Sequence, residues 1–272
     1  TNSNGEISGV ILVAEVITEQ KQAKEQLQQL NQKLLQSNRD LEQFAYVASH
    51  DLQEPLRAIT SFTQLFARKY QGNLDAQADK YIKYIVEGAA RMQQLIEDLL
   101  DFSRIGTHGK DLLPIDLEMI LAQVCSNLKV AISQSQVQIT HQPLPMVRGD
   151  QTQLIQLFQN LLANAIKFRQ SETPKVEIKA IRKANQWLIS VSDNGIGIAA
   201  EYFERIFVIF QRLHSRNEYP GTGIGLAVCQ KIIERHGGDI WLESTLGVDT
   251  TFYFTLSASE STHNYNNVNS KN

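Results

Sequence analysis

The sequence predicts a multidomain protein in which an all-α helical hairpin is followed by an α+β two-layer sandwich. Three observations lead to this fold class. Apolar residues recur at helical spacing over 19–105, glycine and proline interrupt the chain at 106–114, and helical and strand patterns alternate over 115–257. Two hairpins, one from each of two chains, would close a four-helix bundle, so we expect the hairpin to be dimeric.

Length and composition fit about two folded domains. The 272 residues are 42% hydrophobic, enough for each domain to bury a core. The formal net charge of -3 leaves no basic surplus for phosphate-backbone binding, so we expect no nucleic-acid partner. Cys125 and Cys229 lie far apart, which suits a reducing compartment. No apolar stretch approaches the roughly 20 residues that span a bilayer, and we expect a cytoplasmic chain without a membrane segment.

The amino-terminal residues predict a strand and then a coiled coil. Residues 9–17 are rich in β-branched side chains, which is typical of a strand. A lone strand does not fold by itself, so residues 1–18 are predicted to end a domain whose remainder lies outside this sequence. Leu27, Leu34 and Leu41 then recur at seven-residue steps, as a parallel two-stranded coiled coil requires.

The heptad pattern continues into a helical hairpin. The first apolar stripe breaks at 71–73, where glutamine, glycine and asparagine have the composition of a turn. A second stripe over 82–99, with steps of three and four residues, predicts the returning helix. We therefore predict a coiled-coil signalling helix and a dimerising hairpin over 19–105.

The rest of the chain predicts a linker, a second domain and a tail. The linker covers 106–114, the α+β domain 115–257, and a polar tail, expected to be disordered, 258–272. The expected helices lie near 116–134, 150–168 and 226–236, and the expected strands near 137–140, 175–181, 186–192, 239–243 and 251–256.

His50 is a candidate nucleophile. It follows Ala48 of the heptad seam by two residues, or about 200° around a helix, and should point into solvent. Asp51 can hold one imidazole nitrogen protonated or accept its proton, which leaves the other nitrogen free to attack phosphorus. Pro55 removes a nearby helix hydrogen bond. Taken singly, such a histidine or proline is more often structural.

Three further segments suit a nucleotide. Asn160, Asn164 and Lys167 share one helix face, where carboxamide oxygens can ligate Mg²⁺ and lysine can balance phosphate charge. Asp193, at a strand end, can accept a hydrogen bond from an adenine amino group. The glycine-rich segment 221–226 opens a helix whose backbone N–H groups can cradle an anion. Each pattern alone is more often a solvated face, a turn or an ordinary loop.

Together these motifs resemble those of the sensor histidine kinases, particularly the phytochrome-like and PAS-linked type. FAYVASHDLQEPLRAI at 44–59 resembles the histidine box, NLLANAIKF the N box, DNGIGI and GTGIGL the glycine boxes, and IFVIFQRL the F box. The match in order and spacing covers 19–257. It implies an ATP-dependent protein histidine kinase that autophosphorylates His50, with Asp51 assisting, and passes the phosphoryl group to an aspartate of a response regulator in two-component signal transduction.

The resemblance also implies an ATP site with a GHKL-type fold. Asn164 is the implied Mg²⁺ ligand, Asp193 the adenine contact and Phe168 a neighbour of the nucleoside. Arg212 is the implied γ-phosphate contact, in a lid over 212–220. The implied ATP-binding residues are Asn160, Asn164, Lys167, Phe168, Asp193, Gly195, Gly197, Ile198, Arg212, Gly221, Thr222, Gly223, Ile224, Gly225, Leu226 and Thr251.

Two departures limit what the resemblance implies. Glu54 stands where kinases that also dephosphorylate their partner commonly carry threonine or asparagine, so phosphatase activity is not implied. Asp249, in GVDTTFYF, stands where glycine is common. The amino-terminal piece resembles the exit of a PAS-type sensor, which implies an upstream PAS-type or phytochrome-like sensor. The input signal, the response regulator, and transfer within or between subunits of the homodimer are not encoded in these motifs.

Two other hypotheses stay open at the level of sequence. One is another ATPase with the same nucleotide fold, such as the heat-shock chaperone, gyrase-type or mismatch-repair ATPases or the anti-sigma serine kinases, which lack a histidine box on a dimeric hairpin. The other is a dimerisation module that binds nucleotide without transferring phosphate. Radiolabel from ATP that depends on His50 would distinguish the kinase from the first alternative. ATP turnover that depends on Asn164 would distinguish it from the second.

Overall fold

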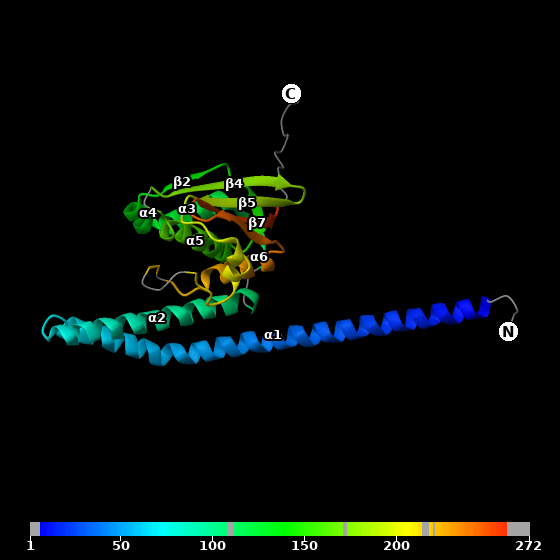
Figure 1. Ribbon diagram of the computed structural model, residues 1–272, viewed down its shortest axis with the longest axis horizontal. Helices are drawn as coiled ribbons and strands as arrows, with labels where there is room; N and C mark the ends of the chain where they lie inside the picture. The colour runs from blue at the N-terminus through cyan, green and yellow to red at the C-terminus, as the bar shows by residue number, and fades with distance from the viewer. Residues whose placement is uncertain (1–5, 108–110, 171–172, 214–217, 220, 260–272) are drawn as a thin grey trace, which may run out of the picture.

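The computed structural model shows a long helical hairpin with an α+β domain resting on it (Figure 1). It describes residues 6–107, 111–170, 173–213, 218–219 and 221–259. The hairpin consists of α1, Glu6–Tyr70, and α2, Ala76–Thr107. The chain reverses between them at the predicted turn, where Gly72 has φ +81°, a conformation that glycine adopts without steric cost.

Residues 9–17, predicted as a strand, are helical and belong to α1. A strand needs a neighbour for its backbone hydrogen bonds, and no strand in the described ranges pairs with this segment. Extending an existing helix adds one hydrogen bond for each residue fixed, so the helix that follows determines the conformation here despite the β-branched residues. The predicted terminal strand over 1–18 is therefore wrong from residue 6 onward, and residues 1–5 lie outside the described part.

The two helices of the hairpin pack through a narrow apolar seam. Leu56 of α1 and Ile82, Ala89 and Leu100 of α2 are each at most 6% exposed. Other apolar residues of the same helices, such as Ile85 at 54% exposure, are not covered by this chain. Among the helices the structure describes, we find none with both the length and the apolar character needed to cross a membrane.

The second domain is built from seven strands and four α-helices in the described ranges. The strands are β1 Leu113–Asp116, β2 Gln138–His141, β3 Met146–Gly149, β4 Lys175–Lys183, β5 Gln186–Asp193, β6 Ile240–Thr245 and β7 Asp249–Ser257. The helices are α3 Leu117–Asn127, α4 Lys129–Ser135, α5 Gln151–Lys167 and α6 Gly225–Arg235, with short 3-10 turns at Ala200–Tyr202 and Arg205–Phe207.

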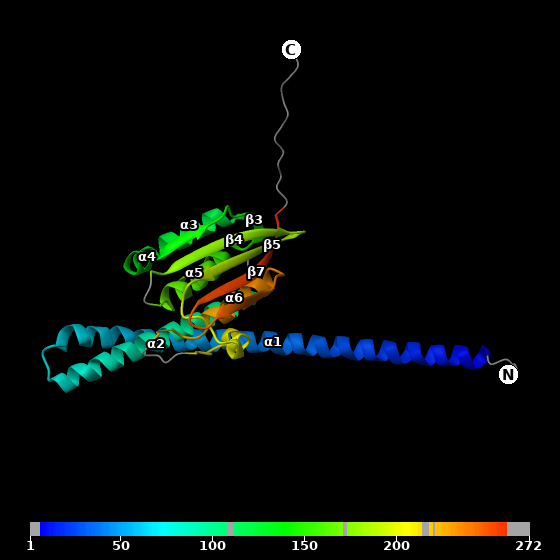
Figure 2. The ribbon, with the colours of Figure 1, turned by 45° about the horizontal axis from the view of Figure 1, so that its top comes forward.

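A five-stranded sheet forms one layer of this domain (Figure 2). Its order is β2-β4-β5-β7-β6, with β2 parallel to β4 and all other neighbours antiparallel. In β4, Val176 and Ile178 are buried, while Glu177 between them and Lys175 before them are exposed on the other face. Phe158 of α5 meets Phe254 of β7 edge to face, with ring centroids 5.7 Å apart. The helices thus cover one sheet face, and the predicted α+β sandwich is confirmed.

The linker is shorter than the predicted 106–114. Helix α2 continues to Thr107, and β1 begins at Leu113, where it pairs with β3. Gly106 lies in the last turn of the helix, where the cost of glycine is small, and Pro114 lies in a two-stranded sheet whose edge tolerates proline. Gly106 and Pro114 thus belong to the ends of two elements, and residues 108–110 of the predicted linker lie outside the described part.

Two other boundaries also differ from the predictions. The helix expected near 116–134 is divided into α3 and α4 at Leu128, just after Ser126 and Asn127, which both have low helix propensity. The tail predicted over 258–272 begins with Ala258, which still forms a bridge with Val147; residues 260–272 lie outside the described part.

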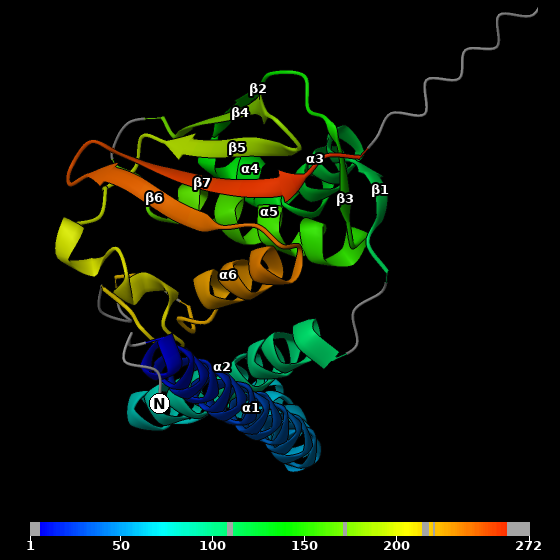
Figure 3. The same ribbon diagram turned by 90° about the vertical axis from the view of Figure 1, so that its right-hand side faces the viewer.

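The second domain rests on α2 (Figure 3), with α6 between the sheet and the hairpin. Ile105 of α2 is 3% exposed and joins the core of the second domain. Gln156 of α5 donates from Nε2 to Asp101 Oδ2 over 3.3 Å. Lys231 of α6 places Nζ 4.3 Å from the ring centroid of Phe102. The two parts of the chain are thus joined by apolar, polar and cation-π contacts.

Candidate functional site

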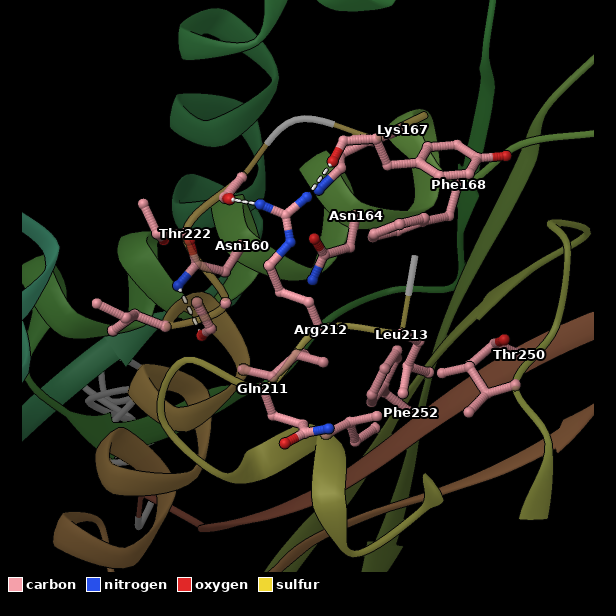
Figure 4. Close-up of a pocket in the computed structure, with 18 of the residues that line it drawn as sticks. Asn160, Asn164, Lys167, Phe168, Gln211, Arg212, Leu213, Thr222, Thr250 and Phe252 are labelled. Carbon is pink, nitrogen blue, oxygen red and sulfur yellow. Dashed lines mark hydrogen bonds between the residues drawn. The ribbon is translucent and has the colours of Figure 1, made fainter. Parts of the chain in front are cut away.

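A cavity of about 270 Å³ lies between α5, the start of α6 and the end of β5 (Figure 4). It is lined by every residue predicted to bind ATP except Gly195 and Thr251. Figure 4 shows Asn160 and Thr222 on one side and Leu213, Thr250 and Phe252 on the other. The cavity therefore has a polar end, suited to phosphates, and a more apolar end, suited to a base.

Helix α5 supplies the polar wall because its apolar stripe is anchored in the core. Asp150 caps the helix by accepting from the backbone N–H of Thr152 at 3.0 Å. Leu157 and Leu161 are at most 1% exposed, which turns the opposite face toward the cavity. Asn160 donates from Nδ2 to the Gly225 carbonyl over 3.1 Å and ties α5 to the first turn of α6. Asn164 and Lys167, the next residues of this polar face, also line the cavity.

Two cations and two aromatic rings border the same space. Lys167 Nζ lies 4.2 Å from the ring centroid of Phe168, and the Phe168 ring lies 4.9 Å from that of Tyr219. Burial, and then the nearby Arg212, lowers the pKa of Lys167. The Arg212 guanidinium donates to the carbonyls of Tyr219, at 2.6 Å, and Gly221. A bound anion would relieve the repulsion between the two cations.

Asp193 stands at the end of β5 and is held by its own loop. Its Oδ1 accepts from the backbone N–H of Gly195 at 2.9 Å. Burial raises the pKa of Asp193 to about 6; the Gly195 hydrogen bond opposes this shift and the Asp249 carboxylate adds to it. Gly195 does not line the cavity, so its part is to orient Asp193 rather than to contact a ligand directly.

Gly197 lets the loop after β5 pass directly beneath the turn between β6 and β7. Its φ is +69°, and a Cβ there would overlap the Thr245 carbonyl oxygen and lie 2.8 Å from Leu246 Cα. The following amide, that of Ile198, donates to Ser244 Oγ at 2.8 Å. The loop that carries Asp193 is thereby fixed to the sheet edge.

Thr250, rather than the predicted Thr251, lines the cavity. Successive residues of β7 point to opposite faces of the sheet, so an error of one position moves the side chain to the wrong face. Thr250 is 4% exposed, whereas Thr251 donates from Oγ1 to Ser192 Oγ at 2.8 Å. Phe252, two residues beyond Thr250, shares its face and adds to the apolar end.

The glycine-rich loop delivers the amino terminus of α6 to the polar end. Gly223, at φ +81°, would bring a Cβ within 2.7 Å of the Gln211 carbonyl oxygen. Its own carbonyl accepts from the Phe210 N–H at 3.1 Å, which joins this loop to the predicted F box. Thr222 donates from Oγ1 to Asp98 of α2. Of the predicted lid over 212–220, residues 214–217 and 220 lie outside the described part.

Several lining residues were not predicted from the sequence. The apolar ones, Ile196, Ile206, Leu213, Val228 and Phe252, lie in or beside the recognised motifs and could have been included from their position. Asp98 could not, because it belongs to a helix of the hairpin and reaches the cavity only through the docking of the two domains. No local pattern signals such a contact.

His50 is exposed on α1, as predicted. Its side chain is 68% exposed and that of Asp51 is 74% exposed, while the preceding Ser49 is 1% exposed and faces inward. His50 Nδ1 lies 3.3 Å from Asp51 Oδ1. With Nδ1 donating to the carboxylate, Nε2 carries the free lone pair. Pro55 lies within α1, which continues as helix through it.

The cavity and His50 lie at about the same height along the hairpin. Arg104 of α2 lies 5.6 Å from the ring centroid of Tyr46 of α1. Because the helices are antiparallel, His50, one turn beyond Tyr46, lies opposite the turn of α2 that precedes Arg104. That turn adjoins Asp98, which lines the cavity.

Comparison with known proteins identifies both domains. Residues 40–108 match the His Kinase A (phospho-acceptor) domain, and residues 149–260 match the histidine kinase-, DNA gyrase B-, and HSP90-like ATPase. His50 lies within the first match and the cavity within the second, apart from Asp98.

Individual relatives agree with the domain matches. The chain is 52% identical over 232 residues to cyanobacterial phytochrome A of Nostoc sp. and 48% identical to the phytochrome-like protein Cph1 of Synechocystis sp., in each case over 85% of this chain. It spans only about 30% of the length of these relatives. The crystal structure of full-length ShkA in complex with AMPPNP superposes with a TM-score of 0.62 at 25% identity, over 80% of this chain and 46% of that one. The chain therefore belongs to the sensor histidine kinases, with a phosphoacceptor domain followed by a GHKL-type ATPase domain.

Proposed function

We propose that this chain is an ATP-dependent protein histidine kinase that phosphorylates its own His50 and passes the phosphoryl group to an aspartate of a response-regulator receiver domain. One observation carries the proposal: an exposed histidine, hydrogen bonded to a carboxylate, lies level with a cavity shaped for a nucleotide. An ATPase without a phosphoacceptor, the first alternative, does not account for the domain match over 40–108.

The polar and apolar ends of the cavity favour one orientation of ATP. The adenine amino group would donate to the Asp193 carboxylate at the apolar end, beside Phe252. The triphosphate would lie at the polar end, near Asn160, Lys167 and the amino terminus of α6, where positive charge and backbone N–H groups are concentrated.

The polar wall also fits a magnesium ion held jointly with the nucleotide. In the described ranges, no cluster of three histidine, cysteine or acidic side chains forms a metal cage. Mg²⁺ is commonly held by one or two protein oxygens together with substrate phosphates and water, and the Asn164 carboxamide oxygen meets that need. When bound, the ion would neutralise charge on the phosphates.

Phosphoryl transfer would use the two faces of the His50 imidazole. The Nδ1–H donates to Asp51, and the Nε2 lone pair attacks the γ-phosphorus in line with the bond to the leaving β,γ-bridging oxygen. A P–N bond forms as that P–O bond breaks, and ADP leaves. The imidazole becomes positively charged, and Asp51 stabilises that charge or accepts the proton from Nδ1.

Labelling with radioactive ATP tests the kinase. We expect label on the protein that is labile in acid and stable in alkali, which is lost in His50→Gln and retained in His141→Gln, a matched histidine in the second domain. Asn164→Ala should abolish ATP turnover, which the second alternative, a non-catalytic nucleotide-binding module, does not predict. Persistence of the label in His50→Gln would overturn the proposal. Transfer of label from the purified phosphoprotein to a receiver domain, lost in a receiver without its acceptor aspartate, tests the second step.

We also propose that the working unit is a homodimer. Leu52, Ile59 and Phe62 of α1 and Ile85 and Met92 of α2 are each at least 48% exposed in one chain and fall on one stripe of each helix. A second hairpin would cover them and complete a four-helix bundle.

The dimer can be tested by placing a charge in the stripe. We expect Ile85→Asp to shift sedimentation from dimer to monomer, whereas Lys83→Asp, on the opposite side of α2, should leave the dimer intact. Mixing His50→Gln with Asn164→Ala subunits then separates two routes. Label in the mixed dimer indicates transfer between subunits, and its absence indicates transfer within one subunit.

The input is proposed to come from an upstream PAS-type or phytochrome-like sensor. The relatives with the highest identity reported above are phytochromes, and about 70% of their length has no counterpart in this chain. Helix α1 would carry the signal to His50. Fusions that attach the sensor part of cyanobacterial phytochrome A in front of α1 through linkers of several lengths should make the labelling of His50 depend on light. Labelling that is independent of light in every fusion would count against this input.

A further inference from the structure

The contact between Thr222 and Asp98 joins the nucleotide cavity directly to the hairpin. Thr222 belongs to the glycine-rich loop that begins α6, and its Oγ1 donates to Asp98 Oδ2 of α2. The other oxygen of the same carboxylate, Oδ1, accepts from Gln94 Nε2 at 2.8 Å. Both carboxylate oxygens are thereby held, and Asp98 is itself a lining residue of the cavity.

The position of Asp98 is unfavourable for a triphosphate. Asp98 contacts Thr222, which belongs with Asn160 and the first amides of α6 to the polar end of the cavity, where positive charge and N–H donors would attract phosphate. A carboxylate at that end adds a like charge and occupies the Thr222 hydroxyl. Repulsion between such charges is substantial near a protein surface at separations of several ångströms.

The same contact is one of several that hold the ATPase domain against α2. Gln156 of α5 donates to Asp101, and Lys231 of α6 lies over Phe102. Gln156 also lines the cavity, but among the α2 residues of these three contacts only Asp98 does, so it is the one whose charge faces a bound nucleotide directly.

We propose that Asp98 is a nucleotide-sensing residue: its contact with Thr222 disfavours a bound triphosphate, so that ATP entry breaks the contact and frees the ATPase domain from α2. This inference rests on the proposed function and adds a regulatory step to it. Coupling between two equilibria is reciprocal, so the factor by which docking weakens ATP binding equals the factor by which ATP weakens docking. The hairpin thus holds the empty domain and releases the loaded one, which must move to reach a histidine.

The test is the affinity for nucleotide of the full chain and two matched variants. Asp98→Asn keeps the size and a hydrogen-bond acceptor but removes the charge. Asp101→Asn makes the same change one turn along α2, at a residue that contacts the second domain through Gln156 but does not itself line the cavity. We expect Asp98→Asn to bind AMPPNP about fivefold more tightly than the unaltered chain, with a smaller gain for ADP, which lacks the γ-phosphate, and Asp101→Asn to show neither gain. Thermal melting confirms that both variants are folded.

Three outcomes would overturn the inference. These are an unchanged or weaker affinity in Asp98→Asn, an equal gain in Asp101→Asn, and an equal gain for ADP and AMPPNP. Small-angle scattering checks the movement: saturating AMPPNP should change the profile of the unaltered chain more than that of Asp98→Asn, and an unchanged profile excludes release of the domain. None of these readouts requires phosphoryl transfer, so failure to label His50 would leave them interpretable.

Discussion

The affinity for ATP should depend on pH through Asp193. Burial raises the pKa of this carboxyl to about 6, so it is about 90% ionised at pH 7, half ionised at pH 6 and about 10% ionised at pH 5. Only the ionised form leaves both carboxylate oxygens free of a proton, so that one can accept from the Gly195 N–H and the other from the adenine amino group. We therefore expect the dissociation constant for ATP to rise about tenfold between pH 7 and pH 5, or about 1.4 kcal/mol.

Titration calorimetry in buffers of different ionisation enthalpy measures both the affinity and the protons released. At pH 6, about half a proton should leave for each ATP bound, because half of the free protein carries the proton and the complex does not. Asp193→Asn is the matched control, since it keeps the shape of the side chain and does not titrate. Triphosphate ionisation is common to both proteins and cancels in their difference. Equal pH dependence and equal proton release in the two proteins would refute the assignment of Asp193 to adenine.

Three further predictions concern stability. Gly197→Ala should lower the free energy of unfolding, measured in urea, by about 2 kcal/mol or more, because the added Cβ meets backbone atoms. Gly72→Ala, also at positive φ but in open space, should cost only about 1 kcal/mol, and equal losses in the two variants would contradict the steric argument. Ile82→Ala should lower the free energy of unfolding by about 2–5 kcal/mol through loss of the hairpin seam, and a change below 1 kcal/mol would show that the seam does not pack as described. His236 accepts from the Asp150 N–H with Nε2, and burial lowers the pKa of His236 below 6.5. Because the unfolded chain therefore binds more protons, the stability contributed by this histidine should be complete above about pH 6.5 and fall as the pH drops further. A urea midpoint that increases as the pH is lowered below 6.5 would contradict this sign.

The parts of the site that a sequence can reveal are those set by local periodicity. Three- and four-residue steps predict that Asn160, Asn164 and Lys167 share one face of a single helix, and all three line the cavity from α5. At Gly197 and Gly223 a Cβ would meet main-chain atoms, so the glycines of these boxes are required by the close approach of backbone segments.

The parts that failed depend on interactions between distant segments. The resemblance implies Thr251, whereas Thr250 lines the cavity, because a strand of alternating residues does not by itself reveal which face meets the cavity; that is decided by pairing and by the core beneath. The strand at 9–17 was wrong because β propensity needs a partner strand, and a growing helix does not. Asp98 was missed because its place in the cavity arises from the docking of two domains.

The length of α1 would let a rotation at its amino-terminal end act on residues far along the same helix. From Glu6 to His50, at 1.5 Å per residue, the helix extends about 66 Å without a break in its secondary structure. Each residue inserted before His50 would rotate the far end by about 100° relative to the histidine, whereas seven would nearly restore the phase. Pro55, the only proline of α1, lies just beyond His50 and has no backbone N–H to donate to the carbonyl of Asp51. A rotation of α1 about its axis would thus meet, within two turns of His50, a turn of helix that lacks one backbone hydrogen bond.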